Sequence, residues 1–440
     1  MQAQAPSPGS ASVWDSAPGT RSESLVPAVQ APPWRRYGLQ AADLALVVAE
    51  GDALSEAVAQ AYQQAHGVPA RNVVRIRLPA QRDTISAAEF APLKAQIDAA
   101  LPPGAQATLL TFVQPSRVAG SCSMSITSAV ALGFDGSRCG GCARTSASAY
   151  FDSESLRPQD ELGWRPSMML GANSLDEARA LIARGLAAQG RLPPGPGWLV
   201  RTADAARSVR HVDWAALPAW GARSELDLRY RDLTQGAGAP QDGEEVMFYF
   251  TGLPRVAGIE RLNWLPGAVA DHLTSFGGLL PNGAGQMTAL AWLRAGATGS
   301  YGTVEEPCNH TQKFPQASVL LGHYLRGASL IEAYWKSVAW PGQGLFVGDP
   351  LARPWADAAV SRIDGQDWVL QTRALRPGAR HEAQWRSDAS QAWQTLEIRI
   401  PAQTGRLEWR IPLPARAGEL RLLGPCADRV ASTCVWAGQS

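Results

Sequence analysis

The stretch DLALVVAEGDALSEAVAQAYQQAHGVPARNVVRIRL, residues 43–78, decides the fold class. Residues 43–50 are a short apolar run bounded by polar residues, as in a buried strand. Residues 55–66 carry apolar side chains at helical spacing, and Gly67 stands where a helix C-cap is expected. Residues 73–78 alternate aliphatic residues with arginine, which predicts a second strand. A strand, a helix and a strand at this spacing predict a β-α-β unit and therefore a parallel sheet.

The alternation of strands and helices continues to about residue 354. Capping boxes at Ser86-x-x-Glu89 and Ser174-x-x-Glu177 start two further helices. The glycine-bearing run 297–304 predicts a strand with close backbone approach. Residues 267–276 fit either a strand or a helix. The remaining predictions are strands at 108–114, 168–170, 197–201, 246–251 and 344–347, and helices at 285–295, 317–326 and 329–338.

The character of the chain changes after Pro354. Residues 360–440 show alternating or aromatic runs without a good helical period, which predicts a small β-sandwich of immunoglobulin type. Residues 1–36 are rich in Pro, Ser and Ala, and we expect a mostly disordered leader there. The chain is therefore predicted to contain the leader, a three-layer α/β domain around a mostly parallel sheet (37–355), and the sandwich (356–440).

Composition limits the function classes. The 440 residues are 45% hydrophobic and 18% charged, which is typical of a globular protein with a large core. The net charge of +1 indicates neither a nucleic-acid nor an acidic-membrane partner. The chain has no run of 18 apolar residues, so no membrane-spanning helix is predicted. Because neither a Walker pattern nor a Gly-x-Gly-x-x-Gly follows the first strand, no cofactor is indicated. We assign the 16 tryptophans to core and domain-interface packing rather than to a glycan surface.

The start of the chain and its cysteines favour export. The opening MQAQAPSPGSAS contains an Ala-Gln-Ala triplet that resembles the cleavage end of a signal peptide lying upstream; a disordered cytosolic tail is the alternative. Six cysteines allow three disulfides in an exported protein, whether periplasmic, outer-membrane-associated or extracellular. We expect one bridge between Cys426 and Cys434. The others are expected among Cys122, Cys139, Cys142 and Cys308.

Polar, reactive residue types gather at the ends of apolar runs in residues 265–354. In a sheet-and-helix protein this pattern predicts a site at strand ends, here for a peptide or a small-molecule ligand. Arg117, after the strand 108–114, is added to the site. The members from residues 265–354 are Asp271, His272, Ser275, Glu305, Glu306, Cys308, His310 and Asp349.

Cys308 and His272 form the best candidate catalytic pair, because a thiol nucleophile needs a neighbouring base. The alternative for Cys308 is a disulfide or a buried thiol. Glu305, Glu306 and His310 offer zinc ligands together with Cys308, but they lack the fixed spacing of a zinc motif, so no metal is predicted.

Other residues have plainer interpretations. Ser275 with His272 suggests a serine hydrolase, but no Gly-x-Ser-x-Gly elbow occurs and we discount it. Asp349 is interpreted as a turn residue, and Asp271 as a residue that orients His272 or Arg117. The Cys139-Gly-Gly-Cys142 motif could be a redox pair, but its loop-like surroundings favour a local structural crosslink.

Three runs carry a resemblance to a known family: GATGSYGTVEEPCN (296–309), EAYWKSVAWPGQGLFVGDPLARP (332–354) and the opening stretch from residue 43. Together they resemble an uncharacterised family of bacterial, mostly exported proteins, over roughly residues 43–355. More remotely, the order of elements is similar to gingipain-like cysteine peptidases of the caspase-like fold. Those peptidases also have a late Gly-Ala strand, a closing Gly-Asp-Pro turn and an immunoglobulin-like domain after it.

The resemblance implies positions for a catalytic dyad. In those peptidases the His follows one strand and the Cys ends the next. Here the first position falls in Thr251-Gly252-Leu253 and the second on Ser275, so neither residue type is present. Two functions therefore stay open. One is a thiol-dependent hydrolase acting on peptides through Cys308 and His272. The other is a non-catalytic relative that binds a ligand or partner at the cell surface or in the periplasm.

Overall fold

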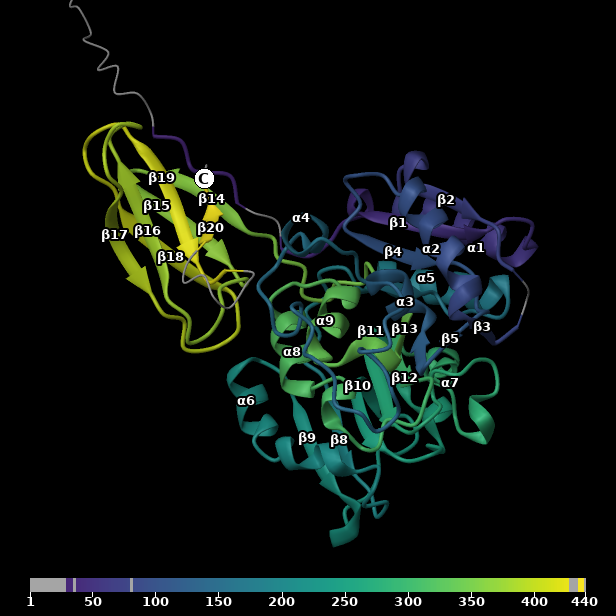
Figure 1. Ribbon diagram of the computed structural model, residues 1–440. Coiled ribbons are helices and arrows are strands. Elements are labelled where there is room, and N and C mark those ends of the chain that lie inside the picture. The colour runs from purple at the N-terminus through teal and green to yellow at the C-terminus, as the bar shows by residue number, and fades with distance from the viewer. Residues whose placement is uncertain (1–28, 35–36, 80–81, 427–433, 439–440) are drawn as a thin grey trace, which may run out of the picture.

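A ten-stranded sheet organises the molecule (Figure 1). The computed structural model describes residues 29–34, 37–79, 82–426 and 434–438. The predicted α/β class with a mostly parallel sheet is confirmed. In sheet order the strands are β2 (Val73–Ile76), β1 (Leu44–Ala49), β4 (Ala107–Leu110), β7 (Ser167–Met169), β13 (Gly344–Gly348), β12 (Gly299–Thr303), β11 (Asn263–Leu273), β10 (Glu245–Gly252), β8 (Gly197–Arg201) and β9 (Leu228–Asp232).

The sheet consists of two parallel halves that run in opposite directions. Every neighbouring pair is parallel except β12 and β13, which are antiparallel with Gly299 opposite Gly348 and Thr303 opposite Gly344. The carboxyl ends of β2, β1, β4, β7 and β13 therefore lie at one edge of the sheet, and those of β12, β11, β10, β8 and β9 lie at the other. Strand ends that look equivalent in the sequence are thus divided between two edges.

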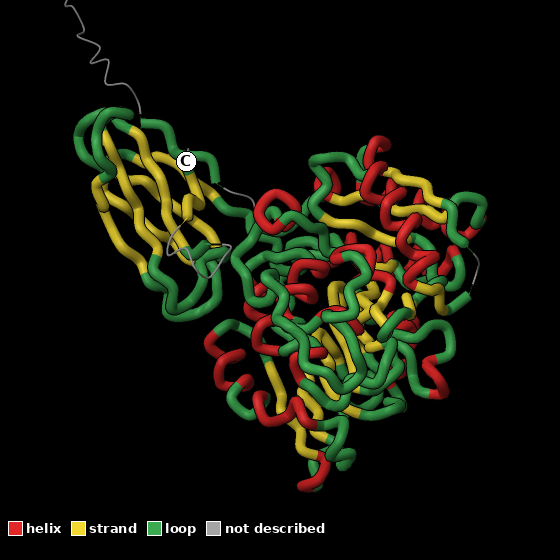
Figure 2. Tube along the Cα trace, viewed as in Figure 1, coloured by secondary structure: helices red, strands yellow, loops and turns green. Residues whose placement is uncertain are grey.

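Helices cover both faces of the sheet (Figures 1 and 2). Tyr249 packs against Trp292 of α7, whereas its strand neighbour Phe248 packs against Tyr324 of α8. Since neighbouring side chains of a strand point to opposite faces, α7 and α8 lie on opposite sides. The helices are α1 (Ala53–His66), α2 (Ala87–Ala100), α3 (Ile126–Leu132), α4 (Pro158–Leu162), α5 (Leu175–Ala188), α6 (Leu217–Arg223), α7 (Ala289–Ala295), α8 (Ala317–Leu325) and α9 (Leu330–Ser337). Among the described residues, none of these helices is long and apolar enough to cross a membrane.

The second half of the sheet resolves one ambiguity of the sequence and confirms one prediction. Residues 267–276, which fitted a strand or a helix, form the end of strand β11 and the turn after it. The predicted close approach in the glycine-bearing strand is confirmed at Gly302. A Cβ there would lie 2.3 Å from the carbonyl carbon of Gly277, so a larger residue has no room.

The predicted long excursion after residue 120 contains regular structure. Helix α3 lies within it, and strand β6 (Ser123–Ser125) joins β5 (Arg117–Ala119) and β3 (Thr84–Ser86) in a small separate sheet. The predictions missed this sheet because strands of three residues carry too little periodic signal.

Two small antiparallel sheets follow the α/β part, as predicted for the C-terminus. The described residues after Trp355 contain strands and no helix (Figure 2). One sheet is β14 (Val360–Asp364), β15 (Asp367–Thr372) and β18 (Leu407–Pro412). The other is β17 (Gln394–Arg399), β16 (His381–Arg386), β19 (Glu419–Gly424) and β20 (Cys434–Ala437).

A buried charge network joins the α/β part to these sheets. Arg326 at the end of α8 forms a two-pronged ion pair with Glu154, and its Nε donates to the Ala374 carbonyl at 2.9 Å. Arg376 contacts the same carboxylate at 2.9 Å and the Asp152 carboxylate at 2.6 Å. The Arg326 and Glu154 side chains are almost fully buried, so this ion pair is shielded from solvent.

The predicted disordered leader lies mostly outside the described residues. Only 29–34 of the first 36 residues are described. Trp34 forms an antiparallel bridge with Ala437, and its ring lies 6.4 Å from that of Trp436, edge to face. The described end of the leader is therefore attached to the last strand of the C-terminal sheets.

Candidate functional site

All six cysteines are in disulfides, as predicted from their even number. The bridges are Cys122–Cys139, Cys142–Cys308 and Cys426–Cys434. The expected pairing of Cys426 with Cys434 is confirmed. The expected local crosslink within Cys139-Gly-Gly-Cys142 is wrong, because Cys139 pairs with Cys122 and Cys142 pairs with Cys308.

Cys308 and His272 are not assembled as a catalytic pair. Cys308 is bonded to Cys142, and a sulfur in a disulfide is not a thiolate nucleophile. The His272 ring is fully buried: Nδ1 accepts from the Trp292 indole at 2.9 Å, and Nε2 therefore carries the proton and donates to the Met287 carbonyl at 3.0 Å. Burial lowers the pKa of His272 to about 4. With both nitrogens occupied, His272 has no position from which to act as a general base.

Asp271 points away from His272, because the two are neighbours on strand β11. It forms a buried ion pair with Arg210 at 2.6 Å. Arg210 also donates to the Thr251 carbonyl at 2.7 Å, and its guanidinium lies 5.6 Å from the Phe314 ring centre. Burial raises the pKa of Asp271 to about 6, and the attraction of Arg210 opposes that rise. The expectation that Asp271 orients His272 or Arg117 is therefore wrong, and its role is to pair a core arginine.

Arg117 lies in the small separate sheet, where its Nε donates to the Thr84 hydroxyl at 2.9 Å.

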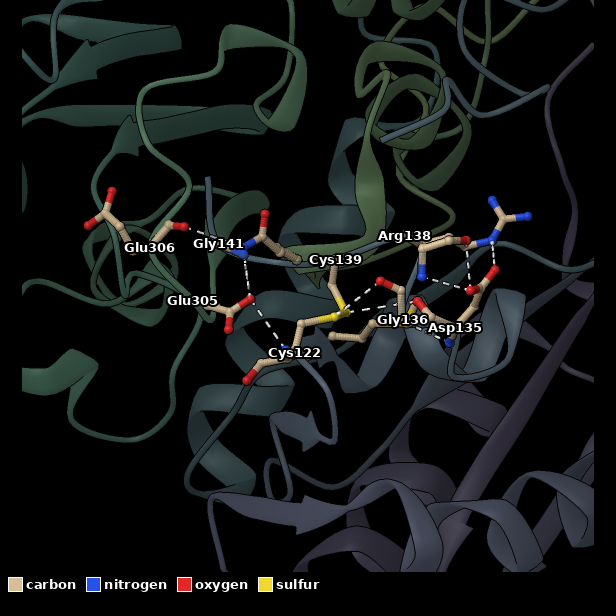
Figure 3. Close-up of a disulfide and its surroundings, with 12 residues drawn as sticks. Cys122, Asp135, Gly136, Arg138, Cys139, Gly141, Glu305 and Glu306 are labelled. Carbon is tan, nitrogen blue, oxygen red and sulfur yellow. Dashed lines mark hydrogen bonds and ion pairs between the residues drawn. A yellow bond between two sulfur atoms is a disulfide. The ribbon is translucent and has the colours of Figure 1, made fainter. Parts of the chain in front are cut away.

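Glu305 and Glu306, which follow β12, hold neighbouring loops in place through hydrogen bonds. Glu305 accepts from the backbone N–H of Gly141 at 3.0 Å and of Ser123 at 3.3 Å, and so ties both segments of the Cys122–Cys139 bridge to β12 (Figure 3). Glu306 accepts from the Ser275 hydroxyl at 2.6 Å and from the Cys308 backbone N–H at 2.9 Å. The predicted proximity of Ser275 and Glu306 at one sheet edge is thus present.

His310 and Lys313 add hydrogen bonds to the same loops. His310 Nε2 is 3.0 Å from the Cys142 carbonyl, so it donates to that oxygen. Lys313, which is not among the predicted site residues, is almost fully buried and its ammonium donates to the Gly141 carbonyl. Burial lowers the pKa of Lys313 to about 8, against the opposing attraction of Glu305 and Glu306. The region around Cys308 is therefore a crosslinked loop cluster with its polar groups paired. Among the described residues, no group of three or more His, Cys, Asp or Glu side chains could hold a metal ion.

Asp349 lies at the opposite edge of the sheet, since it follows β13. It accepts from the Tyr62 hydroxyl at 2.6 Å and from the Leu351 backbone N–H at 3.1 Å, and His66 Nε2 lies 2.9 Å away. The bond to Leu351 is the turn contact expected of it. The bonds to Tyr62 and His66 fix helix α1 against the sheet.

A pocket outside the predicted site lies at the carboxyl ends of β1 and β4. The chain leaves β1 for β2 on one side and returns to β4 on the other, so the sheet order reverses between β1 and β4. In open α/β sheets this switch point is where ligands bind. A pocket of about 380 Å³ opens here, and we call it the switch-point pocket. It is lined by Asp52, Leu54, Ser55, Thr111, Phe112, Val113, Gln114, Asn173 and Pro281.

Two hydroxyls form the inner wall of the switch-point pocket. The Thr111 hydroxyl donates to the Val47 carbonyl at 3.3 Å, and it accepts from the Ser55 hydroxyl at 2.8 Å. Ser55 Oγ in turn accepts from the Ala49 N–H at 2.9 Å. At the mouth, the side-chain amides of Gln114 and Asn173 hydrogen-bond to no other group in the described part of the chain. The pocket thus combines a paired inner wall with free amide donors and acceptors.

No family model, no curated protein and no solved structure matches the chain.

Proposed function

We propose that this chain is a non-catalytic binding protein of an oxidising compartment, and that it binds a small neutral ligand in the switch-point pocket. The observation that carries the proposal is the pair of free amides, Gln114 and Asn173, at the mouth of a pocket at the sheet's topological switch point. Each amide offers two donors and one acceptor oxygen, the groups that recognise hydroxyls and amides of a ligand.

The size and charge of the switch-point pocket define the ligand class. About 380 Å³ is at the lower end of the range for small-molecule sites, which suits a ligand of mono- or disaccharide size. Of the described lining residues only Asp52 is charged, and its carboxylate caps helix α1 by accepting from Leu54 N–H and Ser55 N–H. A neutral molecule rich in hydroxyl or amide groups therefore fits best.

Binding is favoured over catalysis by the residue types present. Among the described residues that line the switch-point pocket there is no His, Cys or Lys that could activate a nucleophile. The Ser55 hydroxyl proton is engaged by Thr111, so Ser55 has no base to receive it. At the other edge, Cys308 is held in a disulfide. These points favour the binding protein over the thiol-dependent hydrolase.

We further propose that the α/β part descends from gingipain-like peptidases and has lost their dyad. The resemblance requires the His-bearing and Cys-bearing strands to be neighbours, and β10 and β11 are adjacent and parallel. Leu253 and Ser275 follow these strands at the dyad positions. Three disulfides support export, where such bridges persist.

A ligand screen by thermal unfolding tests the proposed binding. The probes are neutral mono- and disaccharides and N-acetylated amino-acid amides, each at millimolar concentration. Because a ligand that binds only the folded state raises Tm, we expect at least one probe to do so in the wild-type protein. The double variant Gln114→Ala/Asn173→Ala should lose that shift.

The matched control is Gln64→Ala, which removes an exposed amide from α1 outside the switch-point pocket. It should keep the full shift. An unchanged shift in the double variant would contradict the proposed site, and the absence of a shift with every probe would contradict the proposed ligand class.

A further inference from the structure

A second pocket lies between helices α5 and α7. Its volume is about 270 Å³. The apolar part of the lining comes from Ala180, Leu181 and Leu293, and Gly171 contributes backbone. The charged part consists of Glu177, Arg184 and Arg294.

Arg184 is the unusual member of this second pocket. Its Nη2 donates to the carbonyls of Leu293 at 2.9 Å and Ala297 at 3.2 Å. Its Nε is buried and has no hydrogen-bond partner, and no described carboxylate forms an ion pair with the guanidinium. Burial lowers the pKa of Arg184, and no neighbouring acid offsets that effect.

Two of the most deeply buried arginines have a carboxylate partner. Arg210 pairs with Asp271 and Arg326 with Glu154. Arg294, in the same pocket as Arg184, pairs with Glu177 at 3.0 Å. Arg184 is only partly exposed, and withdrawing a guanidinium from water without a counter-charge is unfavourable. The contacts with the two carbonyls explain why the side chain of Arg184, on α5, reaches the end of α7, but they leave its positive charge uncompensated.

We propose that the pocket between α5 and α7 binds a small monocarboxylate. Its carboxylate pairs with Arg184, and its short apolar body contacts Ala180, Leu181 and Leu293. A single negative charge matches the single uncompensated cation, because Arg294 and Glu177 neutralise each other. The volume suits a carboxylate of a few carbons. This site is separate from the switch-point pocket, and the proposal does not depend on the function proposed there.

Calorimetric titration of the full chain tests the proposal. The probes are butyrate and its neutral isostere butyramide, at low ionic strength, where charge pairing is least screened. We expect butyrate to bind at least tenfold more tightly than butyramide, because a charge-assisted hydrogen bond is stronger than a neutral one. Equal binding of the two probes, or no binding of butyrate, would overturn the proposal without any variant.

Variants then locate the binding. Arg184→Gln should weaken butyrate binding at least tenfold, whereas Arg179→Gln, an exposed arginine on the same helix outside this pocket, should leave it unchanged. If Arg184→Gln fails to fold, Arg184→Lys keeps a positive charge and should retain preference for butyrate over butyramide. Full butyrate affinity in a folded Arg184→Gln protein would overturn the assignment.

Discussion

Cys142 and Cys308 are joined by a disulfide although 166 residues separate them in the chain. The bridge ties the loop 120–142 to the segment after β12, and Glu305 reinforces the same connection through Gly141 N–H. A residue that the sequence offered as a nucleophile is therefore a crosslink between two distant parts of the α/β domain.

Loss of the Cys142–Cys308 bridge should lower stability more than loss of any other bridge. In the chain-entropy model a crosslink stabilises in proportion to the logarithm of loop length, which gives about 5 kcal/mol for this loop and about 3 kcal/mol for the Cys122–Cys139 loop of 17 residues. Urea unfolding of the two double Cys→Ser variants measures the order. A smaller loss for the Cys142/Cys308 variant would contradict the assigned bridges.

Stability should fall as the pH drops from 6.5 to 4. Burial lowers the pKa of His272, His323 and His381 to about 4 each. Unfolding then takes up protons between the ordinary histidine pKa near 6.5 and the folded pKa, so the folded state loses stability in that window. Asp271 opposes the trend, since its folded pKa of about 6 favours proton binding to the folded state.

The variant His381→Gln isolates one of these contributions. Removal of one histidine should reduce the loss of unfolding free energy between pH 7 and pH 4 by about 3 kcal/mol, because burial lowers the pKa of His381 from its ordinary value near 6.5 to about 4. The measurement is the difference in unfolding free energy at the two pH values, which cancels any constant loss of packing. An unchanged difference would mean that His381 is not held neutral in the fold.

The Glu154–Arg326 pair should be essential to the junction between the α/β part and the C-terminal sheets. Glu154→Gln leaves Arg326 buried without its counter-charge, which typically costs about 3–5 kcal/mol. Glu419→Gln is the control, because its pair with Arg386 is exposed and contributes under about 1 kcal/mol. Equal losses in urea unfolding for the two variants would count against a buried junction.

Local sequence signals predicted the first half of the sheet well. The apolar run at 43–50 became β1, and Gly67 adopts the left-handed conformation at the end of α1. Ser86 and Ser174 cap helices as their spacing indicated. These features depend on neighbours within one turn or one strand, so the pattern contains the information needed.

Strand direction was not predictable in the same way. The pattern of Gly344–Gly348 indicates a buried strand, but a buried strand has the same apolar pattern whether its neighbour is parallel or antiparallel. Because β13 is antiparallel to β12, Asp349 lies at the edge opposite Glu305, and the residues of the predicted site are therefore far apart at two edges.

The candidate sites depend on contacts between distant segments. The switch-point pocket combines residues after β1, β4 and β7, and its amides stand in loops without a motif. Arg184 is one of many arginines in the chain, and only its surroundings distinguish it. The one sequence signal that could have indicated the switch-point pocket is that the apolar runs of β1 and β4 are each followed by polar residues.

Hydrogen–deuterium exchange, with and without the probe that raises Tm most, tests the proposed function most directly. Bound ligand should slow exchange of the backbone amides of residues 52–55 and 111–114, which line the switch-point pocket. Residues 305–310 at the opposite edge should be unaffected. Protection confined to residues 272–275 and 305–310, with none at the switch point, would contradict the proposal and place the ligand at the loop cluster around Cys308.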